Sequence, residues 1–422
     1  MRARLHTTPP EIMHAMDACT TPTGNAPRLR GCDIVCVGFA DWNTELWTNQ
    51  HHLMSRLARE NRVLFVESLG LRRPQISGRD LKRVFKRLRD GLRGPRRTDG
   101  LNVLSPLVLP FHAHSTARRI NGWLLPMLVG RATRRLGFER PILWAYVPQA
   151  EALIQTLKPG LVIYHCVDDI AAQPGIDAAS FSSAEIGFAK RADLVLASAP
   201  TLTARLSEVA HDVLYAPNVA DVELFATALD PGPIDPALVE LRHPLIVFTG
   251  AVVATKLDVG LLVELARAQP DWSFALVGPI GLGDPRTDVS ALTAEPNVHL
   301  LGRRAYEQLP AVLRAADAGL IPYAHNKLTE SIFPMKVYEY LAAGLPVVAT
   351  ALPSLAEVAD VATARDAGGI AKLLRDALAQ DSRQHRLERS RRARGHSWDA
   401  RLQEIAARID ALPTREPAGP SS

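Results

Sequence analysis

The chain has few cysteines and no long apolar run. Its 422 residues include four cysteines, at Cys19, Cys32, Cys36 and Cys166, without a C-x-x-C pair or a Cys and His spacing typical of a metal site. We therefore expect reduced thiols in a cytoplasmic protein. No run approaches the roughly 18 apolar residues that a membrane-spanning helix needs. Residues 1–30 also lack the apolar segment of a secretory signal.

Several catalytic motifs are absent too. No G-x-G-x-x-G follows the first apolar run, residues 32–40, which argues against a dinucleotide dehydrogenase. The sequence contains no Walker A motif and no H-E-x-x-H. It also has no D-x-D triplet, which argues against sugar transferases that hold a nucleotide diphosphate through a metal on that motif. We expect neither a metal ion nor a cofactor.

The charge is mildly basic overall and strongly basic in one segment. The formal net charge is +5, but eleven Lys or Arg residues lie between Arg72 and Arg97 against two Asp. Within this segment, residues 81–93 have apolar residues at helical spacing on one face, namely Leu81, Val84, Phe85, Leu88 and Leu92. Such a basic amphipathic helix can lie on an anionic membrane surface, or it can pack on its own domain with a solvated charged side. No recognised nucleic-acid-binding module accompanies it, so we expect no nucleic-acid partner.

Short apolar runs alternate with helical patterns in two series along the rest of the chain. The strands expected in the first series are 32–40, 62–68, 102–108, 141–146, 161–165, 194–197 and 213–215. Those expected in the second are 245–250, 273–278, 298–302, 319–323 and 346–350. Regular alternation of strands and helices predicts parallel sheets with right-handed crossovers.

A Pro- and Asp-rich stretch, residues 230–244, separates the two series. We therefore expect an α/β protein with two Rossmann-like domains facing across a cleft, residues 31–230 and 245–395. A helix is expected at 396–412. The Pro-, Thr-, Ser- and Gly-rich ends, residues 1–30 and 413–422, are expected to be disordered tails.

The most informative motif is SIFPMKVYEYLAAGLPVV, residues 331–348. Pro334 suits the first turn of a helix expected at 335–343. Lys336 and Glu339 are then three residues apart and face the same side. A helix N-terminus attracts phosphate and Lys336 adds a full positive charge, while Glu339 can accept hydrogen bonds from a ribose diol. The residue types alone also fit a surface helix with an ordinary Lys–Glu pair.

This segment resembles the donor-site helix of retaining glycosyltransferases of the GT-B fold, in the branch of teichuronic acid and related surface-polysaccharide enzymes. Those share a P-x-K-x-x-E-Y-L-A-x-G-x-P-V-V pattern. Residues 248–279, 217–225 and 144–149 resemble the same family, and the similarity covers roughly residues 32–400. It implies transfer of a sugar, with retention, from a nucleotide-diphosphate sugar. The acceptor would be a hydroxyl of a saccharide or lipid-linked saccharide, in cell-surface polysaccharide biosynthesis.

The resemblance also implies roles for single residues on the donor side. Gly250 would let the backbone approach the diphosphate, and Gly278 would lie beside the nucleotide. Arg303 would contact the base. Lys336 would neutralise the diphosphate and assist its departure, and Glu339 would hold the ribose.

Three further donor-side positions match less closely. Lys256 lies near the usual phosphate-binding basic position, although a solvated loop lysine is the alternative. Many relatives carry a glutamate eight positions before the helix Glu, where this chain has Ser331. Either Glu330 takes that role through a shifted loop, or Ser331 and backbone groups contact the donor sugar.

In the first domain, His165, Asp168 and Asp169 are the candidate catalytic residues. They come at and after the end of a predicted strand and should open onto the cleft, where they could orient an acceptor hydroxyl or take its proton. The alternative is an Asp pair that caps a following helix. Other residues that could face the acceptor, the tryptophans more often belonging to a core, are Asp41, Glu45, Trp42, Trp47 and Trp144.

Two other functions fit the same fold and donor site. One is a sugar-nucleotide 2-epimerase, and the other is a non-catalytic sugar-nucleotide binding protein. For each of the three functions we expect a cytoplasmic protein, and residues 81–93 suggest peripheral attachment to the inner face of the cell membrane.

Overall fold

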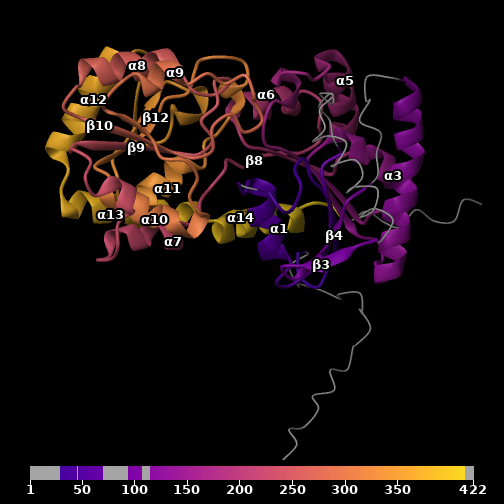
Figure 1. The fold of residues 1–422 in the computed structure, drawn as a ribbon. Coiled ribbons are helices and arrows are strands. Elements are labelled where there is room, and N and C mark those ends of the chain that lie inside the picture. The colour runs from indigo at the N-terminus through magenta and orange to yellow at the C-terminus, as the bar shows by residue number, and fades with distance from the viewer. Residues whose placement is uncertain (1–28, 45, 70–93, 107–114, 414–422) are drawn as a thin grey trace, which may run out of the picture.

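The computed structural model describes residues 29–44, 46–69, 94–106 and 115–413. The basic segment 81–93 and Glu45 lie outside these ranges, and so do the expected tails except for residues 29, 30 and 413. The described chain forms two α/β units side by side, each built on its own sheet (Figure 1).

The N-terminal unit has an eight-stranded sheet in the order β3-β4-β2-β1-β5-β6-β7-β8. Its strands are β1 Asp33–Val37, β2 Arg62–Val66, β3 Arg96–Thr98, β4 Leu101–Leu104, β5 Ile142–Ala145, β6 Leu161–Cys166, β7 Leu194–Ala197 and β8 Val213–Tyr215. Its helices are α1 Asn49–Leu57, α3 Ser115–Leu136, α4 Ile154–Leu157, α5 Ala178–Ala189 and α6 Pro200–Ser207. Helix α7, Val222–Ala226, follows β8 in the chain but packs against the C-terminal unit (Figure 1). The pairing is parallel as expected except at β3, which joins β4 in antiparallel fashion and was missed in the sequence.

The C-terminal unit has a six-stranded parallel sheet in the order β11-β10-β9-β12-β13-β14, the order of the doubly wound nucleotide-binding fold. Its strands are β9 Leu245–Thr249, β10 Ser273–Val277, β11 Val298–Leu300, β12 Ala318–Ile321, β13 Val347–Thr350 and β14 Val361–Ala364. Its helices are α8 Val259–Ala268, α9 Ser290–Thr293, α10 Leu309–Ala315, α11 Lys336–Ala342, α12 Ala367–Gln380 and α13 Arg383–Ala393.

Burial on both faces explains why the central strands read as continuous apolar runs. Every residue of β9 and β10 is buried, as parallel sheets covered by helices require. Helix α8 begins at Asp258, whose carboxylate accepts a hydrogen bond from the Leu261 backbone N–H, and it buries Leu261, Leu262 and Leu265. The predicted α/β architecture with two parallel sheets is confirmed.

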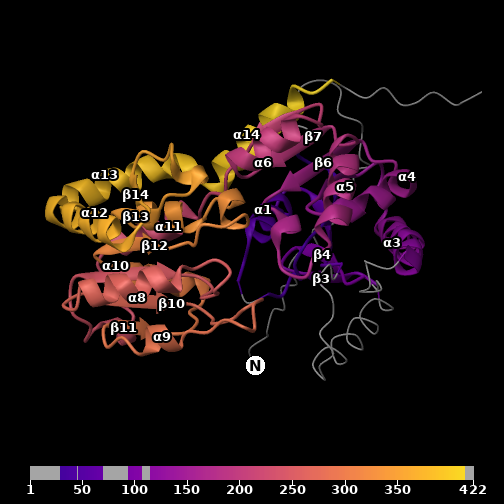
Figure 2. The ribbon, with the colours of Figure 1, turned by 90° about the horizontal axis from the view of Figure 1, so that it is seen from above.

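The chain crosses between the units twice. The first crossing comes before α7, so the expected linker, residues 230–244, already lies on the C-terminal unit, where Arg304 donates to Asp235 at 2.5 and 3.2 Å. Helix α14, Trp398–Asp410, returns to the N-terminal unit, where Arg408 pairs with Asp212 at 2.6 Å. After this return α14 packs beside α1, as Figure 1 shows, and Figure 2 shows its end lying over the N-terminal unit. Within the described ranges, no helix combines the length and the apolarity needed to cross a bilayer.

Candidate functional site

In each sheet, the strand order reverses at one point: between β1 and β5 in the first, and between β9 and β12 in the second. Ligands of open parallel sheets bind beyond the carboxyl ends of the strands at such points. In the C-terminal unit, Gly250 follows β9 and Tyr323 comes shortly after β12. Thr249 is paired with Val277, so Gly250 and Gly278 lie next to each other.

Gly278 is required by a close backbone contact, and Gly250 by its positive φ. A Cβ on Gly278 would lie 1.9 Å from the carbonyl oxygen of Gly250, which no side chain can tolerate. Gly250 has a φ of +124°, and a Cβ there would lie 3.3 Å from Nζ of Lys336. The structure thus brings Gly250, Gly278 and Lys336 together, as the sequence predicts.

Lys336 is the first residue of α11 and points toward aromatic side chains. Its Nζ donates to the Tyr323 hydroxyl at 2.9 Å and lies 5.0 Å from the ring centre of Phe248 and 5.1 Å from that of Tyr323. No carboxylate of the described residues forms an ion pair with it. Since α11 has seven residues, its dipole is small, and the ammonium group is the main attraction for an anion. Phe248 belongs to β9 and Tyr323 follows β12. The sequence motif of the helix therefore could not have predicted their contact with Lys336.

Glu339 is buried, and only 7% of its surface is exposed. Burial raises the pKa of its carboxyl to about 7, opposed by the charge of Lys336. None of the described residues donates a hydrogen bond to this carboxylate. A buried carboxylate without donors is costly unless a ligand supplies them. The alternative of a surface helix with an ordinary Lys–Glu pair is therefore wrong.

Glu330 and Ser331 lie where the two units touch. The Thr201 hydroxyl, at the start of α6, is 3.1 Å from that of Ser331 and donates to the Glu330 carbonyl at 3.3 Å. Ser331 is buried, whereas Glu330 is exposed. The structure thus gives Ser331 a partner in the N-terminal unit and leaves the Glu330 side chain at the surface.

The other two basic candidates differ in their surroundings. Lys256 is half-buried, and its positive charge acts to lower the pKa of Asp168 in the N-terminal unit. Arg303 is exposed, while its neighbour Arg304 is held by Asp235. The structure therefore supplies no contact that ties Arg303 to the other donor-side residues.

His165 does not open onto the junction between the units, so that expectation is wrong. Strand β6 continues to Cys166, which places His165 inside the sheet with 1% of its surface exposed. Its ring stacks on Tyr146 with centres 4.9 Å apart, and neither ring nitrogen has a hydrogen-bond partner. Burial lowers the pKa of His165 to about 3, helped by the charge of Arg401. The imidazole is thus a neutral part of an aromatic core.

Asp168 and Asp169 follow the end of β6, as expected. Burial raises the pKa of Asp168, against the opposing effect of Lys256. Asp169 precedes a short 3-10 turn, Ile170–Ala172, but its side chain makes no capping hydrogen bond. The capping alternative is therefore wrong for Asp169, and the raised pKa of Asp168 makes its carboxylate a stronger base than an ordinary aspartate.

The tryptophans divide between core and surface. Trp42 and Trp144 are buried, with 1% and 0% of their surfaces exposed, so they belong to the core. Trp47 is 37% exposed and stacks on His51. Asp41 follows β1, and its carbonyl contacts the His51 ring at 3.0 Å.

A chain of buried hydrogen bonds joins the two units and was missed in the sequence. The Tyr146 hydroxyl donates to Asn49 at 2.9 Å, Asn49 donates to Asn218 at 2.8 Å, and Asn218 donates to the carbonyl of Phe333 at 2.9 Å. Phe333 lies just before α11. Asn218 belongs to the 217–225 segment that resembles the family, and that segment was the available signal.

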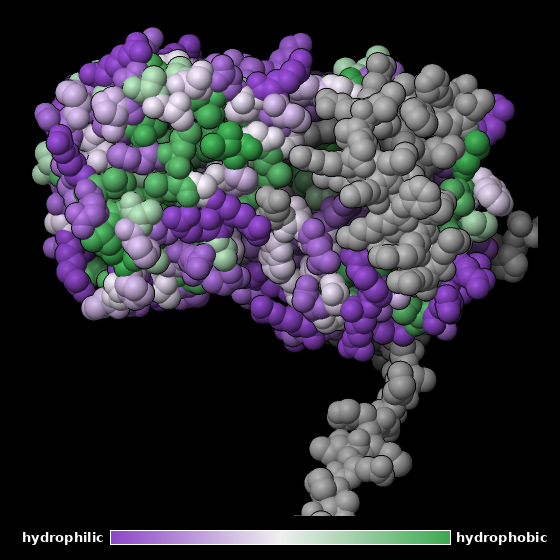
Figure 3. All heavy atoms as spheres, viewed as in Figure 1, coloured by the Kyte–Doolittle hydropathy of each residue, from purple (hydrophilic) through white to green (hydrophobic). Residues whose placement is uncertain are grey.

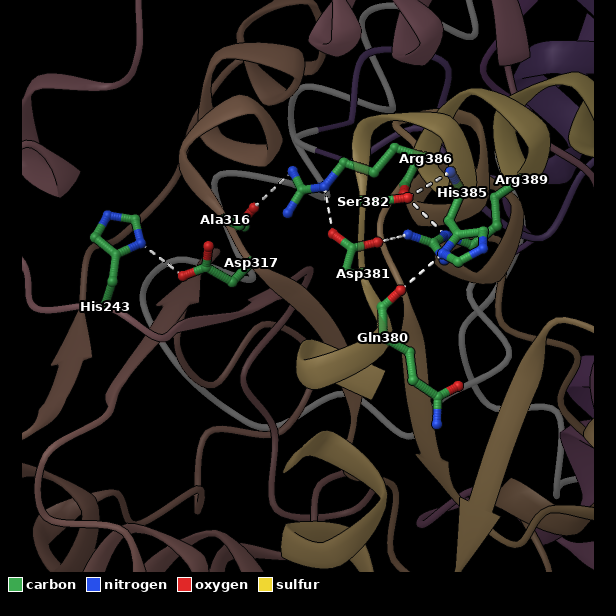
Figure 4. Close-up of polar contacts among 10 residues, drawn as sticks. His243, Ala316, Asp317, Gln380, Asp381, Ser382, His385, Arg386 and Arg389 are labelled. Atoms are coloured by element: carbon green, nitrogen blue, oxygen red, sulfur yellow. Dashed lines mark hydrogen bonds and ion pairs between the residues drawn. The ribbon is translucent and has the colours of Figure 1, made fainter. Parts of the chain in front are cut away.

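The other end of α11 is held by α13. Gly344, with a φ of +79°, ends the helix, and its carbonyl accepts a hydrogen bond from Arg389 at 2.9 Å. Arg389 also pairs with Asp381, which accepts from Arg386 at 2.6 Å, as Figure 4 shows. A Cβ on Gly344 would lie 2.8 Å from the Arg386 carbonyl oxygen. This packing fixes the axis of α11 and hence the positions of Lys336 and Glu339.

A metal site is not evident in the part of the chain that the structure describes. There, no group of three or more His, Cys, Asp or Glu side chains is placed to hold an ion. The cation nearest to the two glycines is the ammonium of Lys336.

Comparison with known proteins agrees with this geometry. Residues 243–380 match the family described as "Glycosyl transferases group 1". The chain is 30% identical over 249 residues to TuaH of Bacillus subtilis (strain 168), whose name describes a teichuronic acid biosynthesis glycosyltransferase. That match covers 56% of this chain and 62% of the relative, so it spans less than two thirds of the relative's length.

Two solved structures illustrate the similarity of the fold. Sucrose-phosphate synthase of Thermosynechococcus elongatus has a TM-score of 0.61 at 17% identity, covering 90% of this chain and 99% of that one. Anabaena HepE in complex with UDP-glucose has a TM-score of 0.63 at 14% identity, covering 90% and 100%. These findings confirm the resemblance found in the sequence: the chain has the GT-B fold, and its residues 243–380 match the group 1 glycosyl transferase family.

Proposed function

We propose that the protein transfers a sugar from a nucleotide-diphosphate sugar to a hydroxyl of a saccharide or lipid-linked saccharide, with retained configuration, in cell-surface polysaccharide biosynthesis. The observation that carries this proposal concerns two residues of one short helix, considered among the described residues. Lys336 forms no ion pair there, and Glu339 is a buried carboxylate to which none of them donates a hydrogen bond. The name of the B. subtilis relative supports a role in polysaccharide biosynthesis. The UDP-glucose complex of Anabaena HepE supports a nucleotide-diphosphate sugar as the donor.

On the donor side, each residue has a distinct task. The absence of a side chain at Gly250 lets the diphosphate approach the backbone there, beside the ammonium group of Lys336, which binds it. Negative charge builds on the diphosphate as the bond from the anomeric carbon to phosphate oxygen breaks, and Lys336 stabilises that charge without a metal. The Glu339 carboxylate accepts hydrogen bonds from the ribose hydroxyls.

On the acceptor side, Asp168 is the group best suited to take the proton. The acceptor oxygen bonds to the anomeric carbon and loses its proton, which a carboxylate with a raised pKa can accept. The positive charge of Lys256 favours the ionised form of Asp168, which is the form that accepts the proton. Attachment to the membrane through residues 81–93 remains a prediction, because that segment lies outside the described residues.

Incubation with UDP-, GDP- and ADP-sugars labelled in the sugar tests the proposal. Transfer of label to a polysaccharide or lipid-linked acceptor supports it, and the anomeric coupling constant of the product reports retention or inversion. An epimerised donor with no transfer would identify the sugar-nucleotide epimerase instead. Tight binding of a donor that stays unchanged with every acceptor would identify a non-catalytic binding protein.

A further inference from the structure

Helix α3 has a second apolar face that no described part of the chain covers. Ile120, Trp123 and Met127 are 48%, 67% and 42% exposed, and their spacing of three and four residues places them on one side of the helix. Hydrophobic residues appear at the right-hand edge in Figure 3, where α3 lies in Figure 1. A largely exposed tryptophan in an apolar row is unusual for a face that remains in water.

The opposite face of α3 already holds the helix to its domain. Leu125, Val129 and Ala132 are buried in the hydrophobic core against the first sheet. The outer row is therefore not needed to fold or to place the helix. Its presence requires a second explanation.

The charge around the outer row has one sign. Arg119, Arg131 and Arg134 are exposed and fall within the same sector of the helix as Trp123, at about 100° per residue. Helix α3 contains no Asp or Glu. No described carboxylate pairs with these three arginines. An apolar strip flanked by unpaired arginines matches a surface that is apolar inside and anionic outside.

Helix α13 of the other unit provides an internal comparison. It is also rich in arginine and exposes Leu387, which is 49% exposed. Three of its five arginines are engaged, however: Arg386 and Arg389 with Asp381, and Arg392 with Asp360. Most of the positive charge of α13 thus serves the fold, whereas Arg119, Arg131 and Arg134 of α3 pair with no carboxylate among the described residues.

We propose that the outer face of α3 docks the protein on an anionic lipid bilayer, with Ile120, Trp123 and Met127 inserted at the level of the headgroups. Arg119, Arg131 and Arg134 then contact the lipid phosphates. Helix α3 lies in the surface plane, because its outer row is one side of a helix whose other side remains packed on the domain.

Co-sedimentation of the full chain with vesicles tests the proposal without any donor or acceptor. We expect binding to vesicles of phosphatidylglycerol and phosphatidylcholine, weakened by salt, and little binding to phosphatidylcholine alone. The change Trp123→Ser with Met127→Ser should lower the partition coefficient at least about tenfold. Arg119→Glu with Arg131→Glu and Arg134→Glu should remove the preference for anionic vesicles. The matched control Leu387→Ser should bind as the parent does.

A second readout locates the helix. Lipids brominated near the headgroup should quench part of the tryptophan fluorescence of the parent, and Trp123→Phe should lose that part although five other tryptophans remain. Unchanged vesicle binding by folded Trp123 and Arg119 variants would overturn the proposal. Sedimentation velocity tests the alternative that the face binds a second copy of the chain. If the parent forms reversible dimers and Trp123→Ser abolishes them without any loss of vesicle binding, the membrane proposal is overturned.

Discussion

At the carboxyl ends of the two sheets, the sequence predicts site residues by the same argument. The prediction is confirmed for the residues of the C-terminal sheet that come together, and it is wrong for His165 of the N-terminal sheet. On the donor side, Gly250, Gly278 and Lys336 come together, with Glu339 one turn further on. On the acceptor side, His165 lies inside the sheet, while the residues beyond it reach the junction. Residues tied to one another within a helix or a strand pair keep their relative positions. Residues placed only by the predicted end of a strand are less certain. If the strand is one residue longer than predicted, the side chain in question lies within the sheet and not beyond its edge.

The largest effect that would sharpen this comparison is expected at Asp168. Replacing Asp168 by Asn keeps the shape and removes the proton acceptor, so turnover should fall by about 10²–10⁴-fold. Nucleotide affinity, measured by titration calorimetry, should stay near that of the parent. Asp169→Asn is the matched control and should have a much smaller effect. Near-normal turnover in both variants would place the acceptor base elsewhere, first at Asp41.

The next effect concerns turnover at Lys336. Lys336→Ala removes a positive charge that matters most as the diphosphate departs, so turnover should fall by about 10²–10³-fold. Initial rates with saturating labelled donor measure this loss. Lys327→Ala, an exposed lysine of the preceding loop, should leave the rate unchanged. Equal losses in the two variants would mean that only the general positive potential matters.

A smaller effect is expected at Glu339. Glu339→Gln should weaken nucleoside binding by roughly 1–3 kcal/mol, the contribution of a charged hydrogen-bond partner. Ribose hydroxyls donate to the ionised carboxylate, so the parent's affinity for uridine should fall as the pH drops below about 7, the pKa of the buried group. The variant should lose this pH dependence. Calorimetry with uridine at several pH values measures both affinities. If the parent and Glu339→Gln show the same pH dependence, the assignment of Glu339 to the ribose is contradicted.

The change Glu339→Gln should have the opposite effect on stability: it should stabilise the unliganded protein at high pH. Its folded pKa of about 7 lies above the ordinary value of about 4.3, so the folded state binds the proton more tightly. Stability from this group is therefore present at low pH and is lost as the pH rises from about 4 to about 7. At pH 8 and without ligand, the free energy of unfolding of Glu339→Gln should exceed that of the parent by about 1–3 kcal/mol. Chemical denaturation measures this difference as a higher midpoint concentration. A less stable variant at pH 8 would mean that the carboxylate has donors in solution.

The smallest effect is expected at His165. The imidazole is neutral and stacked on Tyr146, so His165→Phe keeps the packing and removes two unpaired nitrogens. We expect turnover within about threefold of the parent and stability within about 1.5 kcal/mol, as for volume-conserving core changes. Steady-state rates and chemical denaturation measure the two. A folded variant with a hundredfold loss of turnover would return His165 to the catalytic residues.

Much of the fold and part of the site could be predicted from the sequence. The alternation of strands and helices gave two parallel sheets, and the spacing of Lys336 and Glu339 fixed their common side because both belong to one helix. Tyr323, which contacts Lys336, could not be found in this way, since only the pairing of distant strands brings it there. The link from Asn49 through Asn218 to the carbonyl of Phe333 depends likewise on the docking of the two units. Neither local periodicity nor composition encodes such contacts.

The central claim is that Lys336 and Glu339 hold opposite ends of one nucleotide, and calorimetry with uridine and uridine diphosphate tests it most directly. The parent should bind the diphosphate more tightly than the nucleoside. Lys336→Ala should weaken the diphosphate alone, by about 10–100-fold for a charged contact, whereas Glu339→Gln should weaken both ligands by a similar factor. If Lys336→Ala binds uridine diphosphate as tightly as the parent does, with guanosine and adenosine diphosphates giving the same result, the donor-site assignment is contradicted.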